Sequence, residues 1–141
     1  MSQDPSALAR RWFEEFWNCR RVEVVEELLA PDIRGLIEGG VINGREGFRA
    51  ACLSLLEALP DLRVDVDDCI AQDDRVAVRW TAAGTHTGTA LGLVATGRPV
   101  SFRGMTWLII RDGKIVEGWD AWNQGALVQS LQAPGSSATG A

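Results

Sequence analysis

Cysteine and histidine, the side chains that most often bind metals or staple small folds, are scarce in this sequence. The three cysteines, Cys19, Cys52 and Cys69, lie far apart without a C-x-x-C spacing, and their odd number argues against a disulfide framework. His86 is the one histidine, so the sequence offers no His/Cys cluster. We therefore expect buried, inert thiols and no metal site of the usual ligand types.

Concentrated positive charge and long apolar runs are also missing. The formal charge is −5 and the 14 Lys and Arg residues are spread along the chain, whereas proteins that bind nucleic acid or anionic membranes cluster them. No stretch approaches the roughly 18 consecutive apolar residues of a membrane span, and residues 1–11 lack the apolar run of a signal peptide. We expect a cytoplasmic protein with no nucleic-acid or membrane partner.

The sequence does contain enough apolar material for one domain. Its 141 residues are 46% hydrophobic, which is sufficient to bury a core. The periodic patterns end near residue 132, and residues 133–141 are mostly proline, glycine, serine and other small residues. We predict a single domain over residues 1–132 and a disordered tail over residues 133–141.

The first half of the chain has helical periodicity. After a start signal at Ser2 or Asp4 with Pro5, apolar residues at spacings of three and four form one aromatic face, made of Leu8, Trp12, Phe13, Phe16 and Trp17. Core packing and pocket lining both explain this face, and both hold if the core encloses a cavity. The same signals predict two more helices and a short strand, at Val22–Leu29, Arg45–Leu59 and Ile33–Ile37.

From Leu62 onward the period changes to alternation, which is typical of strands. One hairpin turns at Gln72–Asp74, and the second strand of that hairpin places Val76, Val78, Trp80 and Ala82 on one face. A second hairpin spans Arg98–Asn123, and a short helix follows at Gln124–Gln132. We therefore predict an α+β domain in which helices cover one face of a curved antiparallel sheet and enclose a pocket.

The second hairpin turns at Asp112-Gly113, a strong signal for a two-residue type I′ turn. With an unbroken ladder beyond that turn, Met105 faces Asp120, and Asp120 shares a face with Trp107 and Trp122. A bulge at Gly118 would turn the residues after it onto the opposite face. The pattern alone leaves the facing of Asp120 open.

Asp120 is the most chemically suggestive residue of the chain, because Trp107, Trp119 and Trp122 flank it in this hairpin. Desolvation beside tryptophans raises the pKa of a carboxyl group toward the range that is useful for proton transfer. The alternative is a structural carboxylate that pairs with Arg103 or lies at a solvated sheet edge. Both interpretations are compatible with the residue pattern.

The stretch Gly84–Gly97 is rich in glycine and threonine but lacks the spacing of a phosphate-binding loop. Its 14 residues exceed the length of most hairpin loops. We interpret it as a mobile connection that forms a lid or rim. His86 near its start is either a structural residue or a participant in chemistry.

Several of these stretches together resemble the SnoaL-like polyketide cyclases and ester cyclases of the nuclear transport factor 2-like superfamily. They are GTHTG (84–88), ATGRPV (95–100), FRG (102–104), DGKIVEGWD (112–120) and GALVQSL (125–131). The resemblance implies a cone-shaped, cystatin-like α+β barrel with a deep apolar pocket. It also implies a homodimer or homotetramer that associates through the outer sheet face, and no cofactor or metal.

The resemblance further implies a reaction. The characterised cyclases close the last ring of an aromatic polyketide by intramolecular aldol condensation, with an aspartate as general acid/base, and that aspartate falls on Asp120. The family's histidine on the fourth strand falls at Thr106 or Leu108, and a cavity asparagine falls at Gly35, so this sequence keeps neither polar group. The expected substrate is a hydrophobic carbonyl compound such as a polyketide ester.

The candidate site therefore contains Asp120 as the catalytic residue and a set of residues expected to bind the substrate. These are Trp12, Phe16, Trp80, His86, Thr106, Trp107, Trp119 and Trp122. The tryptophans that face the cavity would stack on a flat ring system, and Thr106 or His86 would hydrogen-bond a substrate oxygen. Two other functions stay open: a different acid/base enzyme of small apolar molecules, such as a hydrolase, dehydratase or isomerase, or a non-catalytic binding or dimerisation module.

Overall fold

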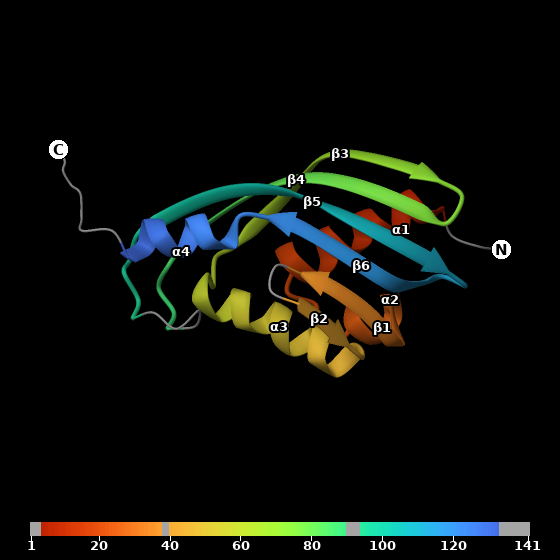
Figure 1. The fold of residues 1–141 in the computed structure, drawn as a ribbon, viewed down its shortest axis with the longest axis horizontal. Helices are drawn as coiled ribbons and strands as arrows, with labels where there is room; N and C mark the ends of the chain where they lie inside the picture. Colours follow the sequence, from red (N-terminus) through yellow and green to blue (C-terminus); the bar gives the residue numbers. More distant parts are fainter. Residues whose placement is uncertain (1–3, 38–39, 90–93, 133–141) are drawn as a thin grey trace.

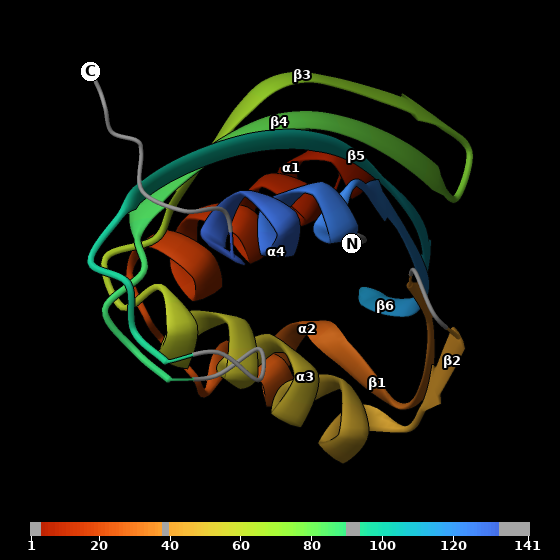
Figure 2. The ribbon, with the colours of Figure 1, turned by 60° about the vertical axis from the view of Figure 1, so that its left-hand side comes forward.

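A six-stranded sheet curves around the N-terminal helices, with the strand order β2-β1-β6-β5-β4-β3 (Figures 1 and 2). The computed structural model describes residues 4–37, 40–89 and 94–132. The strands are β1 (Leu29–Ile37), β2 (Gly40–Asn43), β3 (Arg63–Gln72), β4 (Arg75–Thr85), β5 (Pro99–Arg111) and β6 (Lys114–Trp122). The helices are α1 (Pro5–Arg11), η1 (Trp12–Asn18), α2 (Val24–Leu28), α3 (Arg45–Ala58) and α4 (Gln124–Gln132). The predicted α+β class is confirmed, with a curved sheet that stays open.

The first helix begins where the sequence predicted. Asp4 caps it by accepting a hydrogen bond from the Ser6 backbone N–H at 3.3 Å, and Pro5 occupies the first turn. From Trp12 the chain continues as the π-helix η1 rather than as the α-helix that the apolar spacing predicted. Side chains five apart then align, and Trp12 meets Trp17 edge-on at 6.3 Å between ring centroids.

The two following helices are shorter than predicted because strands and turns begin inside their expected ranges. Helix α2 ends at Leu28, and β1 starts directly at Leu29, four residues before the predicted strand. Helix α3 ends at Ala58, one residue before its predicted end. Strand β2, which the sequence analysis missed, forms an edge hairpin with β1, and β1 pairs in parallel with β6.

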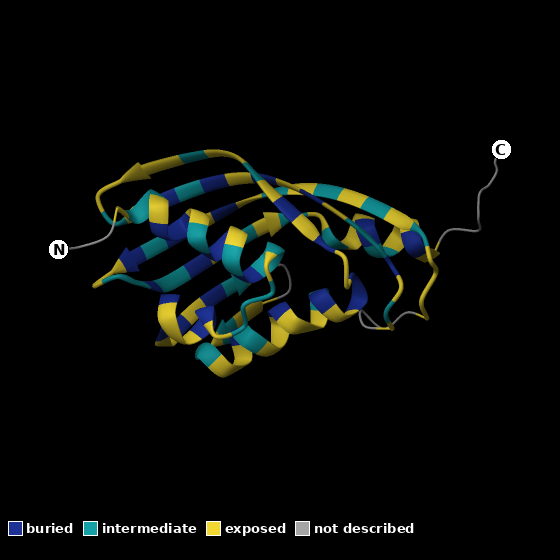
Figure 3. Ribbon diagram, turned by 180° about the vertical axis from the view of Figure 1, so that it is seen from behind, coloured by how far each residue is buried: buried dark blue, intermediate teal, exposed yellow. Residues whose placement is uncertain are grey.

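The inner face of the sheet, defined by Val76, Val78, Trp80 and Ala82 of β4, packs against the helices. All four residues are at most 6% exposed, which confirms the predicted alternation of β4. Buried and exposed positions alternate along the central strands (Figure 3). The core between sheet and helices also contains Leu8, Phe16, Leu28 and Ile115.

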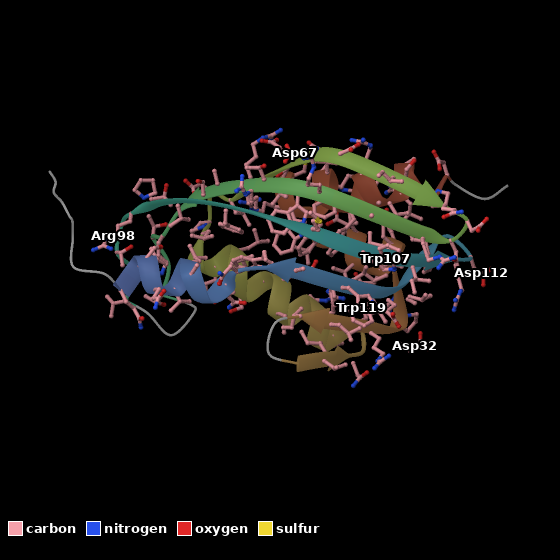
Figure 4. The ribbon with its side chains drawn as sticks, turned by 45° about the horizontal axis from the view of Figure 1, so that its top comes forward. Asp32, Asp67, Arg98, Trp107, Asp112 and Trp119 are labelled. Atoms are coloured by element: carbon pink, nitrogen blue, oxygen red, sulfur yellow. The ribbon has the colours of Figure 1, made fainter. Side chains whose placement is uncertain are left out.

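The β5–β6 hairpin has the predicted turn but not the predicted register. Asp112 and Gly113 have positive φ angles of 53° and 73°, as a type I′ turn requires, and Asp112 lies at the tip of the hairpin (Figure 4). Ile110 pairs with Ile115 as predicted, but the next pair is Ile109 with Glu117. Val116 is therefore an extra residue, a β-bulge.

This bulge determines the facing of Asp120, which the sequence pattern left open. Asp120 lies opposite Thr106 rather than Met105, because one inserted residue shifts every later pair by one and side chains alternate between faces. The bulge lies at Val116 and not at Gly118, the position that the sequence suggested. Thr106 pairs with Val78 of β4, so Thr106 and Asp120 belong to the inner face.

Two segments named in the sequence analysis lie outside the described residues: the predicted tail 133–141 and residues 90–93 of the expected lid. Strand β4 extends two residues, Gly84 and Thr85, into that expected connection. None of the helices within the described residues is long and apolar enough to cross a membrane.

Gly104 on β5 allows two large rings to pack over the centre of the inner face. It pairs with Trp80 on one side and with Trp122 on the other. An added Cβ would lie 2.6 Å from Trp80 Cζ2 and 2.7 Å from Trp122 Cβ, distances that real contacts do not tolerate. The missing side chain therefore provides the space for both tryptophans.

We expect Gly104→Ala to lower the free energy of unfolding by about 1–3 kcal/mol, the usual cost of overpacking a core. Gly118→Ala is the matched control, because its added Cβ meets Leu108 Cδ2 at 3.4 Å, an ordinary contact. Urea unfolding of both variants and the wild type measures the difference. Equal stability of Gly104→Ala and Gly118→Ala would contradict the packing argument.

Candidate active site

A cavity of about 290 Å³ lies between the inner face of the sheet and the helices η1 and α3. Every strand contributes at least one lining residue, and α4 contributes Gln124. Within the part of the chain that the structure describes, most of the lining side chains are apolar or aromatic, and Asp120 is the one carboxylate among them. An apolar cavity with few polar groups is the usual form of a small-molecule site.

The sheet side of the cavity is an aromatic wall made of Trp80, Phe102 and Trp122, one from each of β4, β5 and β6. Phe102 and Trp122 stack with 4.6 Å between ring centroids. Trp80 meets both rings edge-on, at 6.0 and 6.4 Å. These arrangements are favourable for aromatic pairs, so the wall is a well-packed surface.

The helix side supplies a second group of aromatic rings. Trp12 and Trp17 come from η1, and Phe48 comes from α3. Trp12 lies 6.1 Å from Phe48 and stacks at 4.5 Å on Phe16 behind it. The π-helical turn brings both tryptophans to the cavity, because residues five apart share a side of such a helix. A flat ligand between the two walls would contact aromatic rings on both sides.

The polar centre of the site is a chain of two hydrogen bonds on the sheet wall. The Trp80 indole Nε1–H donates to Thr106 Oγ1 at 2.9 Å, and the Thr106 hydroxyl donates to Asp120 Oδ1 at 2.7 Å. Burial raises the pKa of the Asp120 carboxyl, and the bond from Thr106 opposes this rise in part. The group is thus an acid/base candidate inside an apolar cavity.

Cys52 of α3 lies in the same cavity. Burial, and secondarily the charge of Asp120, raise the pKa of its thiol well above the ordinary value. The thiol therefore stays neutral near pH 7 and is a poor nucleophile. This agrees with the expectation of a buried, inert thiol for Cys52. The same expectation is wrong for Cys19, which is exposed, and Cys69 is half-buried.

Five of the nine predicted site residues line the cavity: Trp12, Trp80, Thr106, Asp120 and Trp122. Phe16 is fully buried behind Trp12 and belongs to the core. Trp107 and Trp119 lie on the outer face, where they are 44% and 46% exposed. They pair with each other across β5 and β6 (Figure 4). The bulge at Val116 is the reason that Trp119 points outward and Asp120 points into the cavity.

His86 is also away from the cavity. It is fully buried at the base of the connection between β4 and β5, and its Nδ1 accepts the Thr96 N–H at 3.3 Å and contacts Thr96 Oγ1 at 3.0 Å. Its backbone N–H donates to Arg98 O, and its carbonyl accepts the Gly97 N–H. These contacts favour the structural interpretation of His86 over direct chemistry.

Sequence reasoning did not include Trp17, Phe48 and Phe102 among the site residues, although all three line the cavity. Trp17 belongs to the aromatic stripe of the first helix, and Phe48 to the apolar face of the third. Phe102 shares the inner face with Thr106, since residues four apart in a strand point the same way. The alternation of β5 could have identified Phe102 once the facing of Thr106 was known.

Comparison with known proteins shows the family to which the chain belongs. The family model for the SnoaL-like polyketide cyclases matches residues 7–131. The chain belongs to the SnoaL-like polyketide cyclase family. No curated protein matches it.

Solved structures agree with this assignment. A proposed SnoaL-like polyketide cyclase from Jannaschia sp. CCS1 is 25% identical, with 93% of each chain covered and a TM-score of 0.87. AclR, a proposed hydroxylase from Streptomyces galilaeus, is 31% identical over 93% of this chain and 87% of its own, with a TM-score of 0.80. IdmH, a proposed polyketide cyclase from Streptomyces antibioticus, is 29% identical over 93% of this chain and 100% of its own, with a TM-score of 0.79.

This SnoaL-like chain has other residues at the two positions where the resemblance implied a cavity histidine and a cavity asparagine. Of the two positions that the resemblance offered for a histidine, Thr106 is the one that bonds Asp120. At Gly35, an added Cβ would lie 2.7 Å from the Phe48 ring, so that ring occupies the space where a larger side chain would begin. The cavity is consequently more apolar than the resemblance implies. Within the described residues, no group of three or more His, Cys, Asp or Glu side chains could hold a metal ion.

The raised pKa of Asp120 makes a prediction for stability. Between the ordinary carboxyl pKa and the raised folded-state pKa, the folded protein binds more protons than the unfolded chain, so stability falls as pH rises through this window. Above the window the buried charge destabilises the fold. We therefore expect Asp120→Asn to be more stable than the wild type at pH 7, and the difference to shrink as pH falls through the window.

Urea unfolding of both proteins across this pH range measures the difference. All other titrating groups are shared by the two proteins, so the difference isolates Asp120. A stability difference that does not change with pH would show that Asp120 titrates normally.

Proposed function

We propose that this protein is a cofactor-independent cyclase that performs an intramolecular aldol condensation on a hydrophobic carbonyl substrate such as a polyketide ester. One observation carries the proposal: Asp120, the one carboxylate among the described residues that line the cavity, lies on an aromatic wall, where burial raises its pKa. Family membership supports the same reaction class. Trp12, Trp80 and Trp122 would hold a flat substrate by stacking.

The proposed reaction moves one proton away from the substrate and then returns one. The Asp120 carboxylate takes the proton from the carbon next to a carbonyl group, and the C–H electron pair forms the enolate. The enolate carbon bonds to a second carbonyl carbon of the same molecule, whose π electrons move to its oxygen. The resulting alkoxide takes the proton back from Asp120. No atoms are gained or lost, and the cavity contributes mainly by positioning the two carbonyl groups.

A second reaction class is supported by the similarity to AclR, a proposed hydroxylase. Product mass separates the two classes, because aldol cyclisation leaves the mass unchanged and hydroxylation adds an oxygen atom. The same product analysis identifies a hydrolase or a dehydratase, which would change the mass by the elements of water.

We further propose that the protein forms a homodimer or homotetramer through the outer face of the sheet. Met105, Trp107 and Trp119 are each more than 40% exposed there, on two neighbouring strands. Apolar groups that adjoin on a sheet surface are typical of protein–protein contact sites. A second copy of the chain would remove these rings from water.

We expect Asp120→Asn to lower kcat by about 10²- to 10⁴-fold on anthraquinone-type polyketide esters, the usual contribution of a general acid/base. The measurement is turnover with products identified by mass and chirality, together with ligand binding followed by tryptophan fluorescence. Asp112→Asn is the matched control, because it makes the same substitution at the exposed tip of the same hairpin. Full activity of Asp120→Asn would refute the assignment of Asp120.

We expect Trp107→Glu to weaken self-association by about thirtyfold or more, as for the loss of an interface tryptophan worth about 2 kcal/mol. Sedimentation equilibrium measures the association constant. Leu53→Glu is the control, because Leu53 is 37% exposed on α3, on the other side of the sheet from Trp107. If Trp107→Glu associates as the wild type does, the outer face is not the interface.

A further inference from the structure

Trp80, Thr106 and Asp120 lie on three adjacent strands of the inner face, β4, β5 and β6. Thr106 is directly opposite Asp120 in the sheet register, but Val78, not Trp80, is opposite Thr106. Trp80 pairs with Gly104, and its indole nitrogen reaches along β5 to Thr106 at 2.9 Å. The space above Gly104 makes this diagonal reach possible, since an added Cβ would collide with the Trp80 ring.

The direction of each hydrogen bond in this chain follows from the chemistry of its groups. An indole N–H can only donate, so Thr106 Oγ1 is the acceptor of the bond from Trp80. The single hydroxyl proton of Thr106 is then directed to Asp120 Oδ1 at 2.7 Å. While Thr106 directs its proton at Oδ1, Oδ1 is an acceptor, and a proton bound by Asp120 then resides on Oδ2.

We propose that Trp80 is a positioning residue for Asp120: through Thr106 it keeps Oδ1 occupied as an acceptor and leaves Oδ2 as the oxygen that exchanges a proton with the substrate. The exchange with the substrate rests on the proposed function. The orientation of the Thr106 proton does not, because it is a property of the free protein.

The hydrogen bonds from Trp80 to Thr106 and from Thr106 to Asp120 are the main polar influence on the Asp120 carboxyl group. Among the described residues that line the cavity, Cys52 on α3 is the only other one with a titratable side chain. Its thiol is neutral near pH 7, because its pKa is raised. The two influences on the pKa of Asp120 are burial, which raises it, and the Thr106 bond, which lowers it. A change in the Thr106 bond should therefore be visible in the titration of Asp120.

Removing the indole N–H should strengthen proton binding by Asp120. In Trp80→Phe a smaller aromatic ring remains, but the Thr106 hydroxyl loses the donor that orients it and polarises it. The hydroxyl can then turn and accept a proton from the neutral carboxyl group. We expect the proton-binding constant of Asp120 to rise about threefold or more, the size of one modest hydrogen bond, and to rise further in Thr106→Val.

The experiment is a ¹³C NMR titration of the Asp120 carboxyl carbon in the substrate-free protein, assigned with Asp120→Asn. Thr106→Ser keeps the hydroxyl and should titrate like the wild type. Trp122→Phe is the matched control, because it removes an indole from the same wall while leaving the two bonds of Thr106 in place. If Trp80→Phe titrates like the wild type, or if Trp122→Phe shifts the titration equally, the proposal is wrong.

A second measurement follows the wild-type protein and does not depend on how a Trp80 or Thr106 variant folds. The ¹⁵N–¹H signal of the Trp80 indole should shift with the same midpoint as the Asp120 carboxyl, and this shift should disappear in Asp120→Asn. An indole signal that ignores the ionisation of Asp120 overturns the proposal.

Activity then tests the proposed function separately. The pH profile of kcat/KM should move with the titration in Trp80→Phe if Asp120 is the catalytic base. If the titration moves and the pH profile does not, the positioning of Asp120 by Trp80 holds and the proposed role of Asp120 falls.

Discussion

Val116 adds one residue to β6 relative to β5, and the arrangement of the site depends on this insertion. Because side chains alternate between the faces of a strand, a shift of one residue exchanges the faces of everything beyond it. With the bulge, Asp120 faces the helices and meets Thr106, while Trp119 faces outward beside Trp107. The cavity carboxylate and the exposed tryptophan pair are thus two results of the same backbone irregularity.

The inner face shows how an apolar cavity can hold a carboxylate. Burial of Asp120 raises its pKa, and Thr106 supplies a hydrogen bond that offsets part of this cost. Trp80 orients that bond while its ring forms part of the wall. Gly104 gives the ring its space. Gly104, Trp80 and Thr106 therefore act together on the Asp120 carboxyl group. The same burial that raises its pKa toward a range useful for proton transfer destabilises the folded protein when Asp120 is charged.

Much of the fold could be predicted because its signals are local. Asp112 and Gly113 adopt positive φ angles readily, so the turn and the two strands beside it were clear from the sequence. The alternation of β4 and the cap at Asp4 are local in the same way. The site was predicted only in part: Asp120 and Thr106 were identified, but the tryptophans could not be divided between the cavity and the outer face, because that division depends on the pairing between two strands.

The sequence by itself determined the order of helices and strands, the turn of the main hairpin and the presence of a carboxylate among tryptophans. These follow from backbone preferences and from the periods of apolar residues, which act over a few positions. Only the tertiary structure decided the bulge at Val116, the π-helical turn that brings Trp17 to the cavity, and the parallel pairing of β1 with β6. Each of these is selected by contacts between residues far apart in the chain, whose packing energy outweighs the local preference for a regular ladder or helix.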